Sequence, residues 1–168
     1  IEISQGRRPR ILPASPAAVI ETLQTLAERS ELSLLNLLEM RRPLEIEIAG
    51  LAAERLSEVH AQQLRESIDA LRDAPDRQSE IAADMRFHKV LAEATDNPLF
   101  GIVLDVLAQL LYASRRKTLQ HSGREMALSF HERICAAVCD GDATLARQLM
   151  TQHMDQTRID LLEANGAG

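Results

Sequence analysis

The sequence predicts an all-α protein, an antiparallel bundle of about six to seven helices. Apolar residues make up 45% of the 168 residues, and they recur at helical spacing along most of the chain. With no Trp and 1 Tyr, the core must consist of aliphatic side chains, which favour helix packing. The 7 Gly and 6 Pro are few, and most of them lie where a helix is expected to end.

The first half of the chain is expected to contain a linker and three helices. The linker and the first helix together are expected over 13–29, with Pro13 and Pro16 in the linker and the helix following to about residue 29. The second run, over about 32–56, contains Pro43, whose missing N–H removes one backbone hydrogen bond and predicts a kink. Its predicted inner face consists of Leu34, Leu37, Leu38, Arg41, Leu44, Ile48 and Leu51. The third helix is expected over about 57–72.

The second half is expected to alternate between helices and short breaks. After a connection at 73–78, a helix is predicted over about 79–94, and its inner face consists of Ile81, Asp84, His88, Leu91 and Thr95. Asp96-Asn97-Pro98 ends it and begins a long apolar helix to about residue 119, with Asn97 as the expected N-cap. A loop is expected at 121–123.

The last two helices are predicted to form an antiparallel hairpin. The stretch 131–153 is broken at Asp140-Gly141-Asp142, where glycine suits the end of one helix and Asp142 suits the N-cap of the next. His131 and His153 are equally far from this turn, so they should lie at the same height on facing helices. Both interrupt apolar stripes, so their imidazole rings should converge.

A second pair of polar residues lies one helical turn apart on a predicted inner face. Asp84 and His88 project from the same side of their helix, where a carboxylate is costly to bury unless it is paired or coordinated. One interpretation is a hydrogen bond between the two side chains at an exposed groove. The other is a metal site with four ligands, Asp84, His88, His131 and His153, and such nitrogen and oxygen ligands suit Zn, Ni, Fe or Mn.

Three other residues have two interpretations each. Arg41, on an inner face, could form an ion pair with Glu45 one turn away, or it could bind a carboxylate ligand with two parallel hydrogen bonds. Cys135 and Cys139 could join His131 in a zinc site on one helical face, although small buried cysteines are common on Ala-rich helices. A disulfide framework is not expected from these two cysteines.

Three segments resemble the C-terminal effector domain, called FCD, of GntR-family transcription regulators of the FadR subfamily. They are LLEMRRPLEIEIAGLAAERL (37–56), ADMRFHKVLAEATDNPL (83–99) and HERICAAVCDGDATLARQLMTQHM (131–154). They carry R-x-x-L-E, then D-x3-H, then two histidines that bracket a Gly-Asp turn. Asp84, His88, His131 and His153 match the metal positions of the metal-binding subgroup, and Arg41 matches an arginine near the effector carboxylate.

The resemblance implies an FCD effector-binding domain over 30–168, with an internal divalent transition metal and a small organic acid as effector. Zinc is the first expectation, and the acid is expected to be a hydroxy or sugar acid. The expected assembly is a homodimer. A metal-dependent enzyme with the same four ligands is the main alternative, but no further Glu or His is evident beside them as a general base. A metal-stabilised scaffold that binds no ligand is a third possibility.

Charge and chain organisation limit the partners of this chain. Residues 1–12 resemble the wing strand of a winged-helix DNA-binding domain that is otherwise largely missing from the sequence, and DNA would be bound through that domain. The net charge of −6 makes the chain itself a poor nucleic-acid binder. No apolar run reaches the 18 residues that a membrane span requires, and no signal peptide opens the chain, so a cytoplasmic location is expected.

Overall fold

The computed structural model describes residues 33–166, except for the side chains of 106, 108–122 and 165–166. These residues form the helices α2 (Leu34–Arg55), α3 (Glu58–Arg72), α4 (Arg77–Ala94), α5 (Pro98–Cys139) and α6 (Ala143–Gly166). No strand occurs among the described residues, and the predicted all-α class is confirmed. The expected wing strand at 1–12 and the linker and helix at 13–29 lie outside this part of the chain. None of the described helices is long and apolar enough to cross a membrane.

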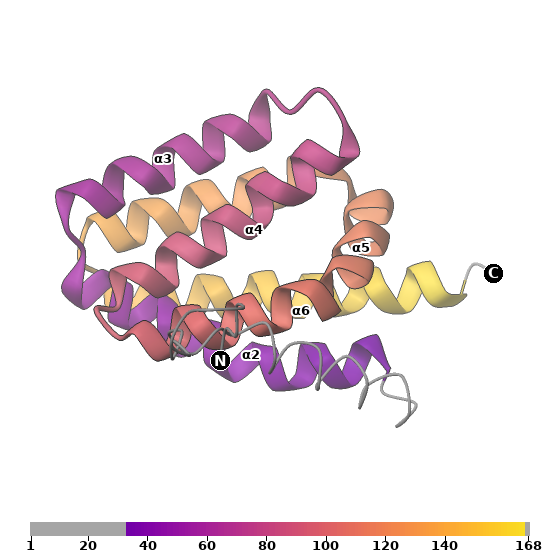
Figure 1. Ribbon diagram of the computed structural model, residues 1–168, viewed down its shortest axis with the longest axis horizontal. Helices are drawn as coiled ribbons and strands as arrows, with labels where there is room; N and C mark the ends of the chain where they lie inside the picture. The colour runs from indigo at the N-terminus through magenta and orange to yellow at the C-terminus, as the bar shows by residue number, and fades with distance from the viewer. Residues whose placement is uncertain (1–32, 167–168) are drawn as a thin grey trace, which may run out of the picture.

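The helices pack into an elongated bundle (Figure 1). Their buried apolar residues form a main core and a smaller cluster around Leu71 and Ile81. Helices α3 and α4 pack side by side along one edge of the bundle, and α2 and α6 lie together along the other. Within the described part of the chain, helix α5 contacts each of the other four helices, and its C-terminal part runs through the middle of the bundle. The core is aliphatic apart from Phe87, as the composition predicts.

Helix α5 is two helical arms joined at Gly123. The residue has φ 77° and ψ 166°, a backbone conformation that glycine adopts without the steric cost of a side chain. The sequence correctly predicts a break here, but the predicted loop over 121–123 is too long, because the backbone stays helical up to the glycine. Figure 1 shows the first arm running along the bundle from left to right and the second arm returning behind α4 toward the start of α6. This return packs the second arm against α4, with one face buried that includes Ala127, His131, Ile134 and Val138.

The turn of the α5–α6 hairpin forms as predicted. Gly141 has φ 72°, the left-handed conformation typical of a residue that follows a helix end. The Asp142 carboxylate accepts a hydrogen bond of 2.9 Å from the backbone N–H of Leu145, which satisfies one of the unpaired donors at the start of α6. The turn fixes the relative height of the two helices and so the height of His131 and His153.

We expect Asp142→Ala to lower the free energy of unfolding by about 1 kcal/mol, because the variant loses this N-cap. The measurement is urea denaturation, and the dependence of unfolding free energy on urea should stay unchanged. Asp140→Ala is the matched control, because Asp140 lies in the same turn, is exposed, and follows the C-terminal end of α5, where a negative charge is unfavourable. Equal destabilisation by both variants would contradict a capping role for Asp142.

The buried face of α2 differs from the prediction. Leu38, Arg41 and Ile48 are buried as expected, but the other predicted positions are only half-buried, namely Leu34, Leu37, Leu44 and Leu51. Glu45 takes the central position instead and is 0% exposed. Pro43 lies inside α2 on its exposed side, and the helix continues past it to Arg55. The inner stripe is therefore Arg41, Glu45, Ile48 and Ala52, which places an acid and a base side by side in the core.

Candidate metal centre

Four side chains from three elements converge inside the bundle. Asp84 and His88 come from α4, His131 from the second arm of α5, and His153 from α6. One carboxylate oxygen and one ring nitrogen from each histidine all lie within 4.8 Å of one another. All four residues are buried. Among the described residues, this is the one group of three or more His, Cys, Asp or Glu side chains gathered closely enough to hold a metal ion.

The three imidazole rings surround a common centre. Their centroids are separated by 5.3 Å for His88–His131, 5.4 Å for His88–His153 and 5.2 Å for His131–His153. Asp84 Oδ1 lies 3.5 Å from Nε2 of His131 and 3.8 Å from Nε2 of His88. Ligand atoms that share an ion at about 2.1 Å in tetrahedral geometry lie ~3.4 Å apart, so side-chain movements of about an ångström would complete the set.

The chemistry of this cluster suits a cation. Burial, together with charge repulsion from the nearby His131, lowers the pKa of His153 to about 3. The His153 imidazole is therefore neutral at physiological pH, which is the form that binds metal. Asp84 contributes a carboxylate to an otherwise neutral ligand set. One oxygen and three nitrogen donors in a dry interior fit a divalent transition metal.

Aromatic packing holds two of the histidine rings in place. Phe87 is fully buried and stacks on His131, with ring centroids 3.9 Å apart and planes 9° apart. Phe130 lies against His153 with centroids 5.3 Å apart. These apolar contacts limit ring rotation and exclude water from the cluster, which strengthens electrostatic interactions inside it.

An ion pair extends the polar cluster toward α2. Arg41 Nε donates a hydrogen bond of 2.6 Å to Glu45 Oε1, and the two side chains are 3% and 0% exposed. The second oxygen, Glu45 Oε2, lies 2.9 Å from Nδ1 of His88. The charges of Arg41 and Glu45 also act on His153, so both groups lie close to the four converging residues. The Arg41–Glu45 ion pair, which is one of the two sequence interpretations of Arg41, is thus present, and it is buried at the site.

The sequence interpretation named Glu45 only as a possible partner of Arg41 and missed its place beside His88. The statement that no further Glu or His stands beside the four ligands is wrong, because Glu45 contacts His88 directly. The available signal was the spacing of Arg41, Glu45 and Ile48, which places Glu45 on the buried stripe. Leu44 and Leu51 obscured this signal, because their apolar side chains predict a buried face of α2 that is shifted by one position along the helix.

The cysteine alternative is not supported by the geometry. The Sγ atoms of Cys135 and Cys139 are 4.0 Å apart, but they do not gather with His131 into a group of ligands. Burial and the neighbouring Cys139 raise the pKa of Cys135 to about 12, which disfavours the thiolate that metals bind. Asn97 acts as the N-cap of α5, as predicted, by accepting a hydrogen bond of 3.1 Å from the backbone N–H of Leu99.

Comparisons with known proteins agree with this architecture. Residues 36–156 match the FCD domain family. Relatives include the HTH-type transcriptional regulators YcbG and LutR of Bacillus subtilis, which are 26% identical over 128 residues and 29% identical over 126 residues. These alignments cover 76% and 71% of this chain, but 54% and 58% of the relatives. The Uxu operon regulator of Haemophilus influenzae is 27% identical over 76% of this chain and 51% of its own length.

Two solved structures share the fold. Streptococcus agalactiae GntR has a TM-score of 0.65 and 24% identity, with 74% of this chain and 57% of that chain covered. Escherichia coli McbR/YncC has a TM-score of 0.68 and 19% identity, with 77% and 64% covered. The chain spans about half the length of the curated relatives it matches. Because the family match extends over more than half of the sequence, the chain belongs to the FCD domain family of GntR-type transcription regulators.

Proposed function

We propose that this chain is the effector-sensing domain of a DNA-binding transcription regulator. Asp84, His88, His131 and His153 would hold a divalent transition metal, with zinc expected first and nickel, iron or manganese as alternatives. A small hydroxy or sugar acid would bind at the same place, with Arg41 on its carboxylate. The observation that carries the proposal is the buried convergence of four ligand-type side chains beside a buried arginine.

The charge of the buried groups supports an anionic effector. With the histidines neutral, as metal ligation requires, the site contains two carboxylates, Asp84 and Glu45, and one guanidinium, Arg41. These groups sum to one negative charge, which a divalent cation would convert to one positive charge. A monocarboxylic acid would neutralise that charge, and charges in a dry interior are costly unless they are balanced. The acid is therefore expected to be a monocarboxylate.

The roles of the residues follow from their chemistry. The metal, when bound, supplies a Lewis acid that attracts the carboxylate and a neighbouring hydroxyl oxygen of the acid. Arg41 has a planar guanidinium that suits two parallel hydrogen bonds to a carboxylate, and it faces the cluster while Glu45 holds its Nε. The aromatic contacts of Phe87 and Phe130 keep the histidine rings in place and exclude water.

Regulation would follow if the acid prefers one arrangement of the protein. Binding energy shifts an equilibrium only by the difference in affinity between two states. We infer that these states are two arrangements of a homodimer, in which the FCD domains set the positions of winged-helix DNA-binding domains. Such a regulator would act in the cytoplasm, where bacterial DNA is available.

The direct test is elemental analysis of the purified protein together with mass spectrometry of small molecules released on denaturation. The proposal expects close to one transition metal ion per chain and a co-purified monocarboxylic acid. Protein that contains no transition metal, and that takes up none when zinc is supplied, would contradict the proposal. A metal without any acid, and no stabilisation by added acids, would leave only a metal-stabilised scaffold.

A metal-dependent enzyme is the alternative function for the same ligands. Hydrolytic chemistry needs a general base near the metal, and the candidate is Glu45, whose carboxylate contacts His88. Both oxygens of Glu45 already accept hydrogen bonds, one from Arg41 and one from His88, which disfavours it as a base that takes protons from water. The matched relatives are named as transcription regulators, which also favours sensing over catalysis.

We expect the chain itself to show no sequence-specific DNA binding at physiological salt. Its net charge is −6, and DNA affinity depends strongly on neutralising phosphates with basic residues. The measurement is a mobility-shift assay against the regulator's own promoter region, with a longer protein that includes a winged-helix domain as the positive control. A specific shift by the present chain would place DNA recognition within the FCD domain.

A further inference from the structure

We propose that Glu45 is a positioning residue that joins the metal-binding and acid-binding halves of the site through its two oxygens. This inference rests on the proposed function, because it concerns the residues that would hold the metal and the acid. Glu45 Oε1 accepts a 2.6 Å hydrogen bond from Arg41, and Oε2 lies 2.9 Å from His88 Nδ1. Glu45 is fully buried, and both partners are 3% exposed, so both contacts are shielded from water.

The contact with His88 determines which ring nitrogen faces the cluster. A carboxylate only accepts hydrogen bonds, so His88 Nδ1 must carry the hydrogen and Nε2 keeps the lone pair. Nε2 is also the atom near Asp84, at 3.8 Å from its Oδ1. Glu45 therefore fixes the tautomer and the ring orientation that metal ligation requires. Such outer partners of a ligating histidine typically change metal affinity by about 10- to 100-fold.

The contact with Arg41 orients the guanidinium. Arg41 and Glu45 are one turn apart on α2, and the helix directs both side chains toward α4 and α6. The hydrogen bond from Arg41 Nε to Glu45 restricts the orientation of the guanidinium plane. This orientation determines whether the carboxylate of a bound acid can accept two hydrogen bonds from Arg41 or only one. The Glu45 carboxylate thus determines which nitrogen of His88 is available to a metal and how the Arg41 guanidinium is oriented.

A purely structural ion pair is the competing explanation. In that case Glu45 would stabilise α2 against the core, and its loss would reduce stability without a specific effect on metal binding. Arg41→Met breaks the same ion pair but leaves the Glu45–His88 contact. Comparing Glu45→Gln with Arg41→Met therefore separates loss of the ion pair from loss of the histidine's partner.

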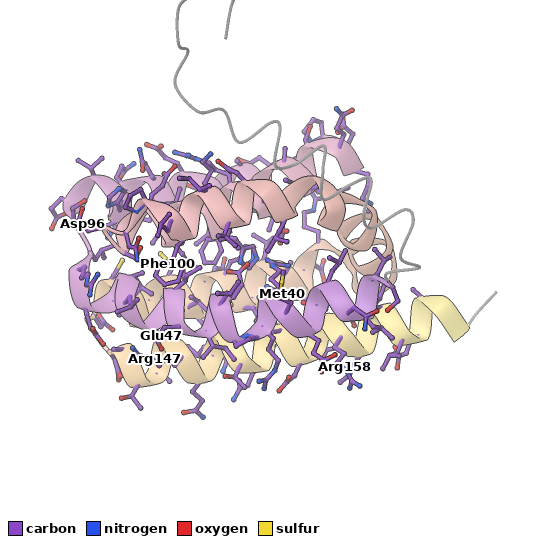
Figure 2. All side chains as sticks on the ribbon, turned by 60° about the horizontal axis from the view of Figure 1, so that its bottom comes forward. Met40, Glu47, Asp96, Phe100, Arg147 and Arg158 are labelled. Carbon is purple, nitrogen blue, oxygen red and sulfur yellow. The ribbon has the colours of Figure 1, made fainter. Side chains whose placement is uncertain are left out.

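Glu47→Gln provides a matched control on the same helix. Glu47 lies two residues from Glu45 but on the outer face, where it contacts Arg147 of α6 (Figure 2). The Oε1–Nη2 distance there is 3.0 Å. The control removes the same charge by the same substitution and also breaks an ion pair between side chains. It differs from Glu45→Gln in having no contact with a candidate metal ligand.

The experiment measures the affinity of chelator-stripped protein for Zn²⁺, using a competing chromophoric chelator, and the absorption spectrum after loading with Co²⁺. We expect Glu45→Gln to weaken Zn²⁺ binding by about 10- to 100-fold and to alter the Co²⁺ spectrum. The Zn²⁺ affinity of Arg41→Met should stay within about threefold of the wild-type value, and that of Glu47→Gln within about twofold. A tenfold change in affinity corresponds to ~1.4 kcal/mol of binding free energy. Unchanged Zn²⁺ affinity and an unchanged Co²⁺ spectrum in Glu45→Gln would overturn the inference.

A double variant keeps the test decisive if Glu45→Gln fails to fold. Replacing both members of a buried ion pair is far better tolerated than removing one, so Arg41→Met, Glu45→Gln should fold. It should show the same loss of Zn²⁺ affinity, and wild-type affinity in this variant would overturn the inference. Failure of the wild type to bind Zn²⁺ would instead overturn the proposed function, so the two failures are distinguishable.

Discussion

A double variant with His131→Ala and His153→Ala is expected to purify with almost no transition metal, whereas the wild-type protein is expected to carry close to one ion per chain. The substitutions remove two of the four converging ligands, one from each helix of the hairpin. Asp84 and His88 alone, one turn apart on α4, provide too few donors for a closed site. The measurement is metal analysis by inductively coupled plasma mass spectrometry after dialysis, with folding checked by circular dichroism.

Cysteine variants provide the control for this experiment. Cys135→Ser, Cys139→Ser should keep the wild-type metal content, because neither Sγ atom belongs to the gathered ligands. Both cysteines follow His131 on α5, about one and two helical turns later, so the control changes the same helix without altering an imidazole. Equal metal content in the histidine variant and the wild type would refute the four-residue site. Loss of metal from the cysteine variant alone would favour the zinc site built on cysteine.

The histidine convergence follows from features that short sequence segments contain. Helical spacing places His131 and His153 on buried faces, and the Asp140-Gly141-Asp142 turn determines that these faces meet at equal height. The structure agrees, with 5.2 Å between the two ring centroids. Local rules are sufficient here because one tight turn connects the two helices, and few alternative arrangements bury both stripes.

The role of Glu45 depends on contacts that no local pattern contains. His88 lies 43 positions away in the chain, and the contact arises only because α2 packs against α4. Periodicity also favoured the wrong stripe on α2, since Leu44 and Leu51 are more apolar than Glu45 but lie at the flank of the interface. The transfer preference of a leucine is modest, about 2 kcal/mol, so a polar network with well-formed hydrogen bonds competes with it.

The length of the break in α5 illustrates a different difficulty. The polar residues before Gly123 predict a loop, yet the helix continues until the residue with positive φ. Backbone hydrogen bonds favour extension of the helix up to the first residue with a non-helical conformation. Helix propensity alone does not locate that residue. The position of the break was predictable, whereas its extent was not.

A hydroxy or sugar monocarboxylic acid is expected to raise the melting temperature of the metal-loaded protein. A ligand that binds only the folded state adds about 2.7 kcal/mol of stability at ~100-fold excess over its Kd. Chelator should abolish this stabilisation, because the acid would bind through the metal. The measurement is a thermal-shift screen of small acids at neutral pH on wild-type protein, with and without chelator. Equal stabilisation of chelated protein would mean that the metal has no part in acid binding.

Arg41 variants test which residue holds the carboxylate of that acid. Arg41→Ala should reduce the thermal shift while metal content remains intact, and Arg41→Lys should restore it only in part, since an ammonium lacks the planar pair of donors. Each variant needs its own baseline, because Arg41→Ala leaves Glu45 buried without its ion-pair partner, a change that costs about 3–5 kcal/mol in other proteins. A shift in Arg41→Ala equal to that of the wild type would assign carboxylate binding to another cation, with Arg115 and Arg116 on α5 the next residues to test.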